Sequence, residues 1–186
     1  AGIQKLRDDG QDRGLLISAT GTGKTYLSAF DVLKMQPRRF LFVVHREIIV
    51  KSARDSYVRI GINPADTGLL TGHDKELDKP YIFATIQTLS QDEILHTFAP
   101  DTFDYIVIDE VHHGGAATYQ KVIRYFQPKF LLGMTATPER SDDFDIYALF
   151  HHHIAYEIRL HDALEENMLV PFHYHGISEI TVNGKV

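Results

Sequence analysis

A chain of 186 residues is long enough for one full-sized hydrophobic core, and 44% hydrophobic with 24% charged residues is ordinary for a globular protein. Its apolar runs fall short of the roughly 18 residues of a membrane span, and we expect no secretory leader. The lack of cysteine excludes disulfides and fits a cytoplasmic location, and the formal net charge of −6 excludes a general nucleic-acid-binding surface, so any such contact must be local.

Apolar runs and helical spacings alternate along the chain. Continuous apolar runs predict buried strands at 15–17, 40–44, 81–84, 105–108 and 130–134, and a short strand around Leu69 and Leu70. Helices are expected within 1–14, at 26–35 with Leu27, Phe30 and either Leu33 or Val32 facing inward, from about 47 to 57, and at 86–98, 118–126 and 144–150. This alternation predicts an α/β fold, a parallel sheet with helices on both faces.

The first predicted strand runs into a glycine-containing segment that has the character of a phosphate-binding loop. With Gly23, Lys24 and Thr25 fixed, the pattern G-x-x-x-x-G-K-[ST] departs at one position, where Ser18 replaces the first glycine. We expect Lys24 to reach the β- and γ-phosphates and the Thr25 hydroxyl to hold Mg²⁺. The alternative is a turn that only joins a strand to a helix. The expected nucleotide-binding residues are Thr20, Gly21, Thr22, Gly23, Lys24 and Thr25.

A pair of acids closes the strand at 105–108. Asp109 is expected to hold Mg²⁺ and Glu110 to polarise the attacking water, although two acids at a strand end also suit an exposed turn. His112 is expected to bond toward the segment 135–137, with a solvated loop or a metal site as alternatives. The run 151–153 of three histidines suits a helix C-terminus, with metal binding as its alternative.

The candidate residues follow different strands, so all of them would line one edge of a parallel sheet. Arg46, Thr85 and Gln87 add a basic group, a hydroxyl and an amide to that edge. Such groups suit a sugar–phosphate track, but taken alone they fit surface polarity equally well.

Together the motifs resemble those of superfamily 2 helicases and translocases, above all the restriction-subunit-like group with the helicase subunits of type I and type III restriction enzymes. In the family's order, motifs I, Ia, Ib, II and III resemble segments 19–25, 43–46, 84–89, 109–112 and 135–138. The segment at 109–112, Asp-Glu-Val-His, is similar to the DEAH form of motif II.

The resemblance implies a RecA-like domain over 1–158, and a linker with the start of a second RecA-like domain over 159–186, with linker-like sequence from Ile154. It implies ATP and Mg²⁺ as ligands, Glu110, Lys24 and His112 as catalytic residues, Thr135 and Thr137 as coupling residues, and Arg46, Thr85 and Gln87 as contacts to nucleic acid. The expected partners are nucleic acid, with DNA favoured over RNA, the second domain of the same chain, and a nuclease or methyltransferase; no membrane is expected.

The implied function is that of an ATP-dependent motor domain of a DNA helicase or translocase, nearly inactive without its second domain. A nucleic-acid-dependent ATP switch that binds duplex without moving is the alternative, because both classes use the same motifs. The adenine-reading glutamine of the family has no good counterpart here, since Gln4 lies too close to motif I.

Overall fold

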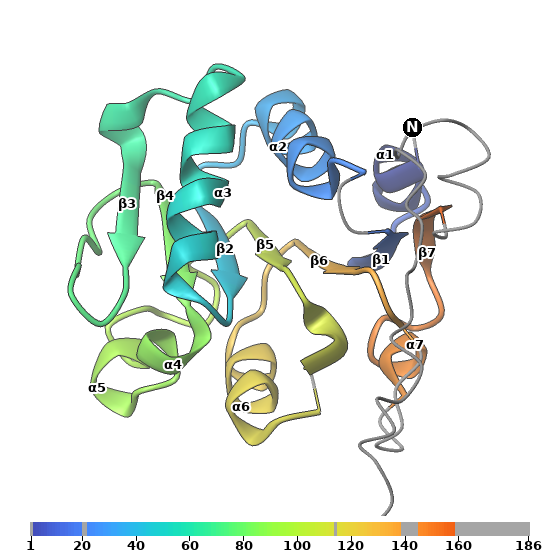
Figure 1. Cartoon of the computed structure of the whole chain (residues 1–186). Helices are drawn as coiled ribbons and strands as arrows, with labels where there is room; N and C mark the ends of the chain where they lie inside the picture. Colours follow the sequence, from blue (N-terminus) through green and yellow to red (C-terminus); the bar gives the residue numbers. More distant parts are fainter. Residues whose placement is uncertain (1, 20–21, 114, 139–144, 159–186) are drawn as a thin grey trace, which may run out of the picture.

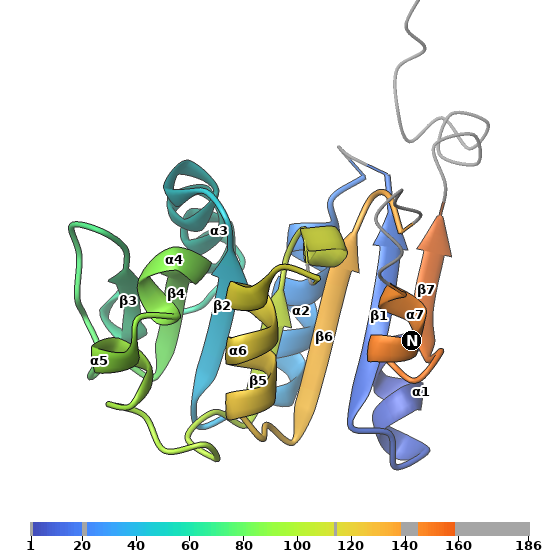
Figure 2. The same ribbon diagram turned by 90° about the horizontal axis from the view of Figure 1, so that it is seen from below.

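The structure, a computed structural model, describes residues 2–19, 22–113, 115–138 and 145–158. Their centre is a seven-stranded parallel sheet in the order β3-β4-β2-β5-β6-β1-β7 (Figures 1 and 2). The strands are β1 (Arg13–Ser18), β2 (Phe40–Val44), β3 (Thr67–Leu70), β4 (Tyr81–Thr85), β5 (Tyr105–Ile108), β6 (Phe130–Thr135) and β7 (Ile154–Ile158). The order places the strands that precede the candidate residues side by side.

Helices cover both faces of the sheet, which is why its inner strands are apolar on both sides. One face carries α1 (Gly2–Asp8), α2 (Lys24–Met35) and α3 (Glu47–Arg59). The other carries α4 (Ile86–Leu89), α5 (Asp92–Leu95), α6 (Ala117–Tyr125) and α7 (Ile146–Leu149). Two 3₁₀ turns, η1 (Pro64–Asp66) and η2 (Val111–His113), complete the described elements. The α/β prediction is confirmed.

The helix expected at 86–98 is wrong as a single element. The chain forms two four-residue helices instead, α4 and α5, because Gln91 between them is extended, with φ −65° and ψ 132°. The break leaves Leu89, Leu95 and Phe98 all buried in one core, which a straight helix with a single apolar stripe would not achieve as readily. Of the helix expected at 144–150, residue 144 lies outside the described residues.

Strand β7 forms from the segment that begins at Ile154. The resemblance implied linker-like sequence from Ile154 within a first domain that ends at 158, and the structure shows that Ile154–Ile158 pairs in parallel with β1 in the same sheet. The pairing of β7 depends on tertiary structure. Strand β1 pairs with β6 on one side and leaves its other edge open for β7, which the sequence of this segment does not indicate. Residues 159–186 lie outside the described part of the chain.

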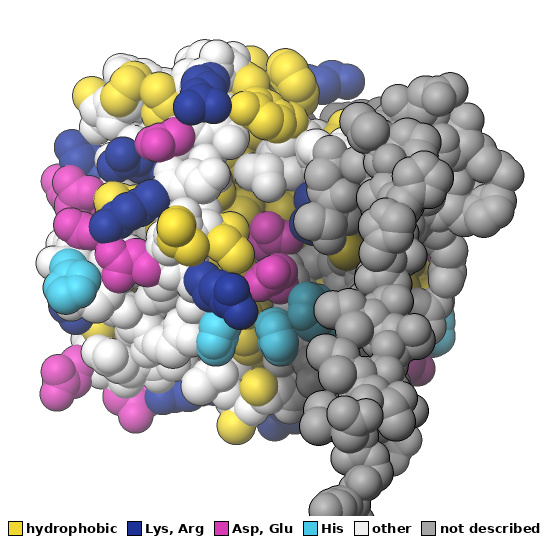
Figure 3. Space-filling view, in the orientation of Figure 1, with side chains coloured by type: hydrophobic (Ala, Val, Ile, Leu, Met, Phe, Trp, Pro, Cys, Tyr) yellow, Lys and Arg dark blue, Asp and Glu magenta, His cyan; other side chains and the backbone are white. Residues whose placement is uncertain are grey.

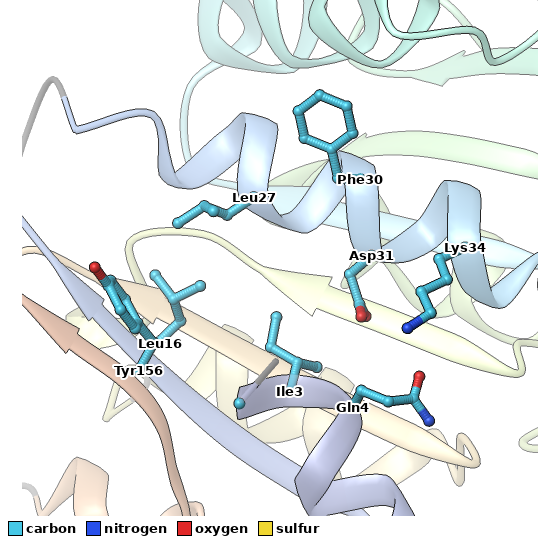
Figure 4. Close-up of a pocket in the computed structure, with 9 residues that line it drawn as sticks. Ile3, Gln4, Leu16, Leu27, Phe30, Asp31, Lys34 and Tyr156 are labelled. Carbon is cyan, nitrogen blue, oxygen red and sulfur yellow. The ribbon is translucent and has the colours of Figure 1, made fainter.

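Helix α2 is rotated relative to the sequence prediction. Val32 is buried, as one of the two alternatives expected, together with Ser28 and Ala29, whereas Leu27 and Phe30 are 42% and 58% exposed. The small residues allow α2 to approach the sheet closely, which turns the large ones outward. Figure 4 shows Leu27 and Phe30 beside a pocket of about 390 Å³ that α1, β1 and β7 also line.

A polar cluster joins α1 to the sheet beneath this pocket. Arg7 donates to both carboxylate oxygens of Asp31, at 2.6 and 2.7 Å, and lies over the Phe130 ring at 5.2 Å. The Tyr105 hydroxyl donates to the same carboxylate at 2.9 Å. Gln4 accepts from Arg7 and donates to Asp8, so its amide is engaged within α1.

Candidate nucleotide-binding site and adjoining rim

The carboxyl ends of five neighbouring strands meet at one edge of the sheet. The register pairs Val44 with Thr85, Val43 with Ile108, and Ile17 with Thr135, so the segments that follow these strands start at the same level. Figure 2 shows the strands running toward this edge, and Figure 3 looks onto it. Acidic, basic and histidine side chains gather near the middle of that face. The predicted convergence is therefore present.

The predicted phosphate-binding loop ends at a residue with a left-handed backbone. Gly23, the N-cap of α2, has φ 83° and ψ 25°, and no side-chain hydrogen bond caps the helix. A Cβ at Gly23 would meet no atom within 4 Å, so conformation rather than space requires glycine there. The uncapped N–H groups and the helix dipole favour an anion at this point. Lys24 and Thr25 open the helix, and Thr20 and Gly21 lie outside the described residues.

Ser18 has a role that the motif comparison missed. It is 1% exposed at the end of β1, and its hydroxyl hydrogen-bonds the Thr22 hydroxyl, which in turn donates to the Ala19 carbonyl at 2.6 Å. Ser18, which replaces the first glycine of the pattern, thus links the start of the loop to Thr22 through a hydrogen bond. The only sign of this bond in the sequence is a serine at a predicted strand end with a threonine four residues later.

Asp109 is a buried carboxylate with few hydrogen-bond donors. It is 4% exposed, and the one hydrogen bond that the structure gives its side chain comes from the Glu110 N–H at 2.9 Å. Burial raises the pKa of Asp109, against the opposing attraction of the Lys24 ammonium. The charge of Lys24 therefore acts on Asp109 across the site. A desolvated carboxylate beside an uncapped helix N-terminus fits a divalent cation carried by a triphosphate.

Glu110 occupies a strained position directly after Asp109. Its φ of 53° lies in the left-handed region, which side chains with a Cβ avoid. The chain then turns into η2, and the His113 N–H donates to the Glu110 carbonyl at 3.0 Å. This turn keeps the Glu110 side chain partly exposed beside the buried Asp109. Backbone strain of this kind is often found where a side chain must be held at a reactive position.

The contact expected between His112 and the segment after β6 is present. His112 Nδ1 lies 3.2 Å from Thr135 Oγ1, and the same oxygen accepts from the Thr137 N–H at 3.1 Å. Because Thr135 Oγ1 accepts from Thr137, its proton is available for the histidine nitrogen. Within the described residues, no group of three or more ligand-type side chains is arranged to hold a metal ion.

The residues expected to contact nucleic acid differ in their exposure. Arg46 is exposed at the N-cap of α3, and Gln87 is exposed in α4. Thr85 is only 6% exposed, and its hydroxyl donates to Thr88 at 3.0 Å. Thr85 is the last residue of β4, and its hydroxyl is bonded to Thr88 of α4 inside the protein rather than facing solvent.

The three histidines at 151–153 follow the end of α7. His151 and His152 have φ of 53° and 59°, and their N–H groups donate to the carbonyls of Ala148 and Tyr147. These bonds close the C-terminus of the helix, as expected for the first interpretation. Among the described residues, His151 Nδ1 lies 3.8 Å from the Asp12 carboxylate.

None of the helices within the described ranges has the length and apolar character that crossing a bilayer requires.

Comparison with known proteins places this geometry in a family. Residues 1–140 match the family of the type III restriction enzyme res subunit. The chain is 30% identical over 178 residues to the Escherichia coli type I restriction enzyme EcoAI endonuclease subunit, covering 88% of this chain and 21% of that one. It is 31% identical over 138 residues to a Halobacterium salinarum protein named as a putative DNA 3'-5' helicase Rad25, covering 73% and 23%.

A solved structure gives the same fold. The Hef helicase domain of Pyrococcus furiosus superposes with a TM-score of 0.68 at 22% identity, over 84% of this chain and 37% of that one. The chain thus spans roughly a fifth of the length of the curated relatives described above. Its sheet is a RecA-like sheet of the helicase type. The chain belongs to the type III restriction enzyme res subunit family, as a first RecA-like domain of the superfamily 2 helicases.

Proposed function

We propose that this chain is the ATP-binding half of a DNA translocase motor, in which ATP hydrolysis drives movement along nucleic acid. The feature that carries the proposal is a buried Asp109 carboxylate with a single hydrogen-bond donor, which is attracted electrostatically by the ammonium of Lys24 at the uncapped start of α2. A cation, an uncapped helix N-terminus and a desolvated acid are the groups that bind a triphosphate with its metal. Family membership supports the helicase-type reaction.

Each residue has a distinct task in this proposal. The N–H groups at the start of α2 and the Lys24 ammonium bind the phosphates, and the Thr25 hydroxyl and Asp109 hold Mg²⁺. When bound, Mg²⁺ neutralises charge on the β- and γ-phosphate oxygens. Glu110, held partly exposed by its left-handed backbone, orients the water that attacks the γ-phosphate. Thr135 and Thr137 pass the state of the site to a second RecA-like domain.

Nucleic acid would bind along the same edge, on the side of β2 and β4. Arg46 and Gln87 are exposed there and supply a cation and an amide for a sugar–phosphate backbone. The Halobacterium relative is named as a DNA helicase, which favours DNA over RNA. With a net charge of −6, the protein would depend on these local contacts rather than on its overall field.

The proposal is tested in the complete protein by displacement of a triplex-forming strand from duplex DNA, measured together with phosphate release. We expect wild type to displace the third strand with ATP, and Glu110→Gln to bind ATP yet lose both activities. Glu93→Gln, an exposed acid of α5, is the matched control and should behave as wild type. DNA-stimulated hydrolysis without displacement would instead identify a switch that does not move.

A further inference from the structure

A row of side chains crosses the carboxyl edge of the sheet, one step for each strand. Gln87, after β4, places its Nε2 2.8 Å from Nδ1 and 3.2 Å from Nε2 of His45, after β2, and donates to the ring. The His45 ring lies 5.7 Å from the ring of His113, which follows β5. His113 lies 4.2 Å from the ring of His112, and His112 reaches Thr135, the last residue of β6. The strands β4, β2, β5 and β6 are neighbours in that order.

The two ends of this row belong to different functional regions. Gln87 and His45 are exposed, and Arg46, the neighbour of His45, is one of the residues proposed to bind nucleic acid. At the other end, Thr135 is fully buried and His113 donates its backbone N–H to the carbonyl of Glu110. Each contact of the row joins two neighbouring side chains, so a displacement of one changes the position available to the next. The row is therefore a continuous path from the nucleic-acid rim to the residues that handle ATP.

Tyr119 places a buried hydroxyl beside this row. The Tyr119 side chain, on α6, is 1% exposed, and its ring lies 6.4 Å from that of His113. Its hydroxyl has no hydrogen-bond partner among the described residues, and burial together with the charges of Glu110 and Asp109 raises its pKa. A buried hydroxyl without a partner is destabilising, because it has lost its hydrogen bonds to water. An arrangement of the row that supplies a partner would recover the lost stability.

We propose that His45 and His113 are positioning residues that report the occupancy of the nucleic-acid rim, through Gln87 at one end and Thr135 at the other, to the ATP site. The inference rests on the proposed function. Nucleic acid that engages Gln87 withdraws the amide from His45, and the rings shift toward the Tyr119 hydroxyl. The movement reaches the Glu110 carbonyl and the Thr135 hydroxyl together, so DNA binding raises the rate of hydrolysis rather than the affinity for ATP.

The test measures DNA-stimulated ATP hydrolysis by the complete protein, with His45→Ala as the main variant. His45 is exposed, so its replacement should leave the fold intact, and basal hydrolysis without DNA should remain within about twofold of wild type. At saturating DNA, we expect stimulation to fall about fivefold or more, the scale of an allosteric coupling of 1–3 kcal/mol. The DNA concentration for half-maximal stimulation should change little.

Three further variants separate a path from a local contact. His96→Ala removes an exposed histidine of similar kind, with a ring contact of 5.5 Å to Tyr125, and should leave stimulation unchanged. His45→Phe keeps the ring but loses the nitrogen that accepts from Gln87, and should lose stimulation as His45→Ala does. Combining His45→Ala with Thr135→Val should cost no more stimulation than the larger single loss, because both interrupt one path.

The outcomes are distinguishable. If wild type shows no DNA-stimulated hydrolysis, the proposed function fails and the row fails with it. If wild type is stimulated and His45→Ala reaches the same maximal rate, the row is overturned while the proposed function stands. A rise confined to the half-maximal DNA concentration also overturns it, because His45 would then be a DNA contact and not a positioning residue.

Discussion

Asp104 and Asp109 stand at the two ends of strand β5 and are both buried, at 6% and 4% exposed. Asp104 accepts hydrogen bonds from the Lys129 ammonium at 2.9 Å and the Arg38 N–H at 2.9 Å. Asp109 accepts one, from the N–H of its own neighbour. The same residue type is thus satisfied at the amino end of the strand and left largely unsatisfied at the carboxyl end.

The pKa values of the two acids differ accordingly. Burial acts to raise the pKa of both, but at Asp104 the hydrogen bonds from Lys129, Arg38 and the backbone outweigh it and lower the pKa to about 2. At Asp109, burial prevails over the attraction of Lys24, and the pKa is raised. One end of β5 therefore stabilises the fold, and the other holds a desolvated carboxylate with few hydrogen-bond donors, a feature that is typical of binding sites.

Replacing Asp109 should produce the largest effect on activity and little loss of stability. We expect Asp109→Asn to lower ATP hydrolysis in the complete protein by about two orders of magnitude or more, since preorganised charge at a reacting centre has that scale. Its thermal midpoint should equal or exceed that of wild type, because a carboxylate with a raised pKa is destabilised when charged. A fall of several degrees in the midpoint would show that Asp109 is structural.

Replacing Asp104 should produce the opposite result. Asp104→Asn leaves the Lys129 and Arg38 donors without a carboxylate, and we expect a loss of about 2 kcal/mol in the free energy of unfolding by urea titration. ATP hydrolysis by the folded protein should be close to normal. Asp101→Asn, an exposed neighbour, is the control and should change neither quantity.

The pH dependence follows from the lowered pKa of Asp104. Its ordinary value is 3.8 and its folded value about 2, so the stabilisation is complete above the first and is lost as pH falls through the second. Between about pH 4 and pH 2, wild type should lose about 2 kcal/mol more than Asp104→Asn does. If the free energy of unfolding fell equally with pH in wild type and Asp104→Asn over this range, Asp104 would not have the role proposed here.

The smallest effect concerns the backbone of the carboxyl edge. Gly23→Ala should cost about 1 kcal/mol, because alanine resists the left-handed φ of 83° although the space for its Cβ is free. Gly72 also has free space around its Cβ but no positive φ, and Gly72→Ala should be neutral or slightly stabilising. Equal changes in urea midpoint would mean that the loop carries no such strain.

The sequence predicts the role proposed for Asp109 but not the structural role of Asp104. The apolar run at 105–108 predicts β5, and the acid pair after it, read with the loop at 19–25, predicts which aspartate carries chemistry. Nothing local predicts the partners of Asp104, because Arg38 and Lys129 come from distant positions and meet it only in the folded sheet.

The remaining misses have the same cause. The outward rotation of α2, the burial of Thr85 and the pairing of β7 with β1 all depend on which neighbour packs against an element. Periodicity shows that a helix or strand has an apolar side, but the choice among several apolar sides is made by tertiary packing. Ser18 is a related case, since its bond to Thr22 exists only because the loop folds back on the strand.

The direction of β7 has a consequence for the place of its carboxyl end. Because β7 runs parallel to β1, its carboxyl end lies on the same edge of the sheet as the carboxyl end of β1 (Figure 2). An antiparallel seventh strand would have placed this end about one strand length away, at the opposite edge. Under the proposed function, a cation placed at the carboxyl end of β7 would therefore have a high effective concentration near the phosphates that we propose bind at the start of α2.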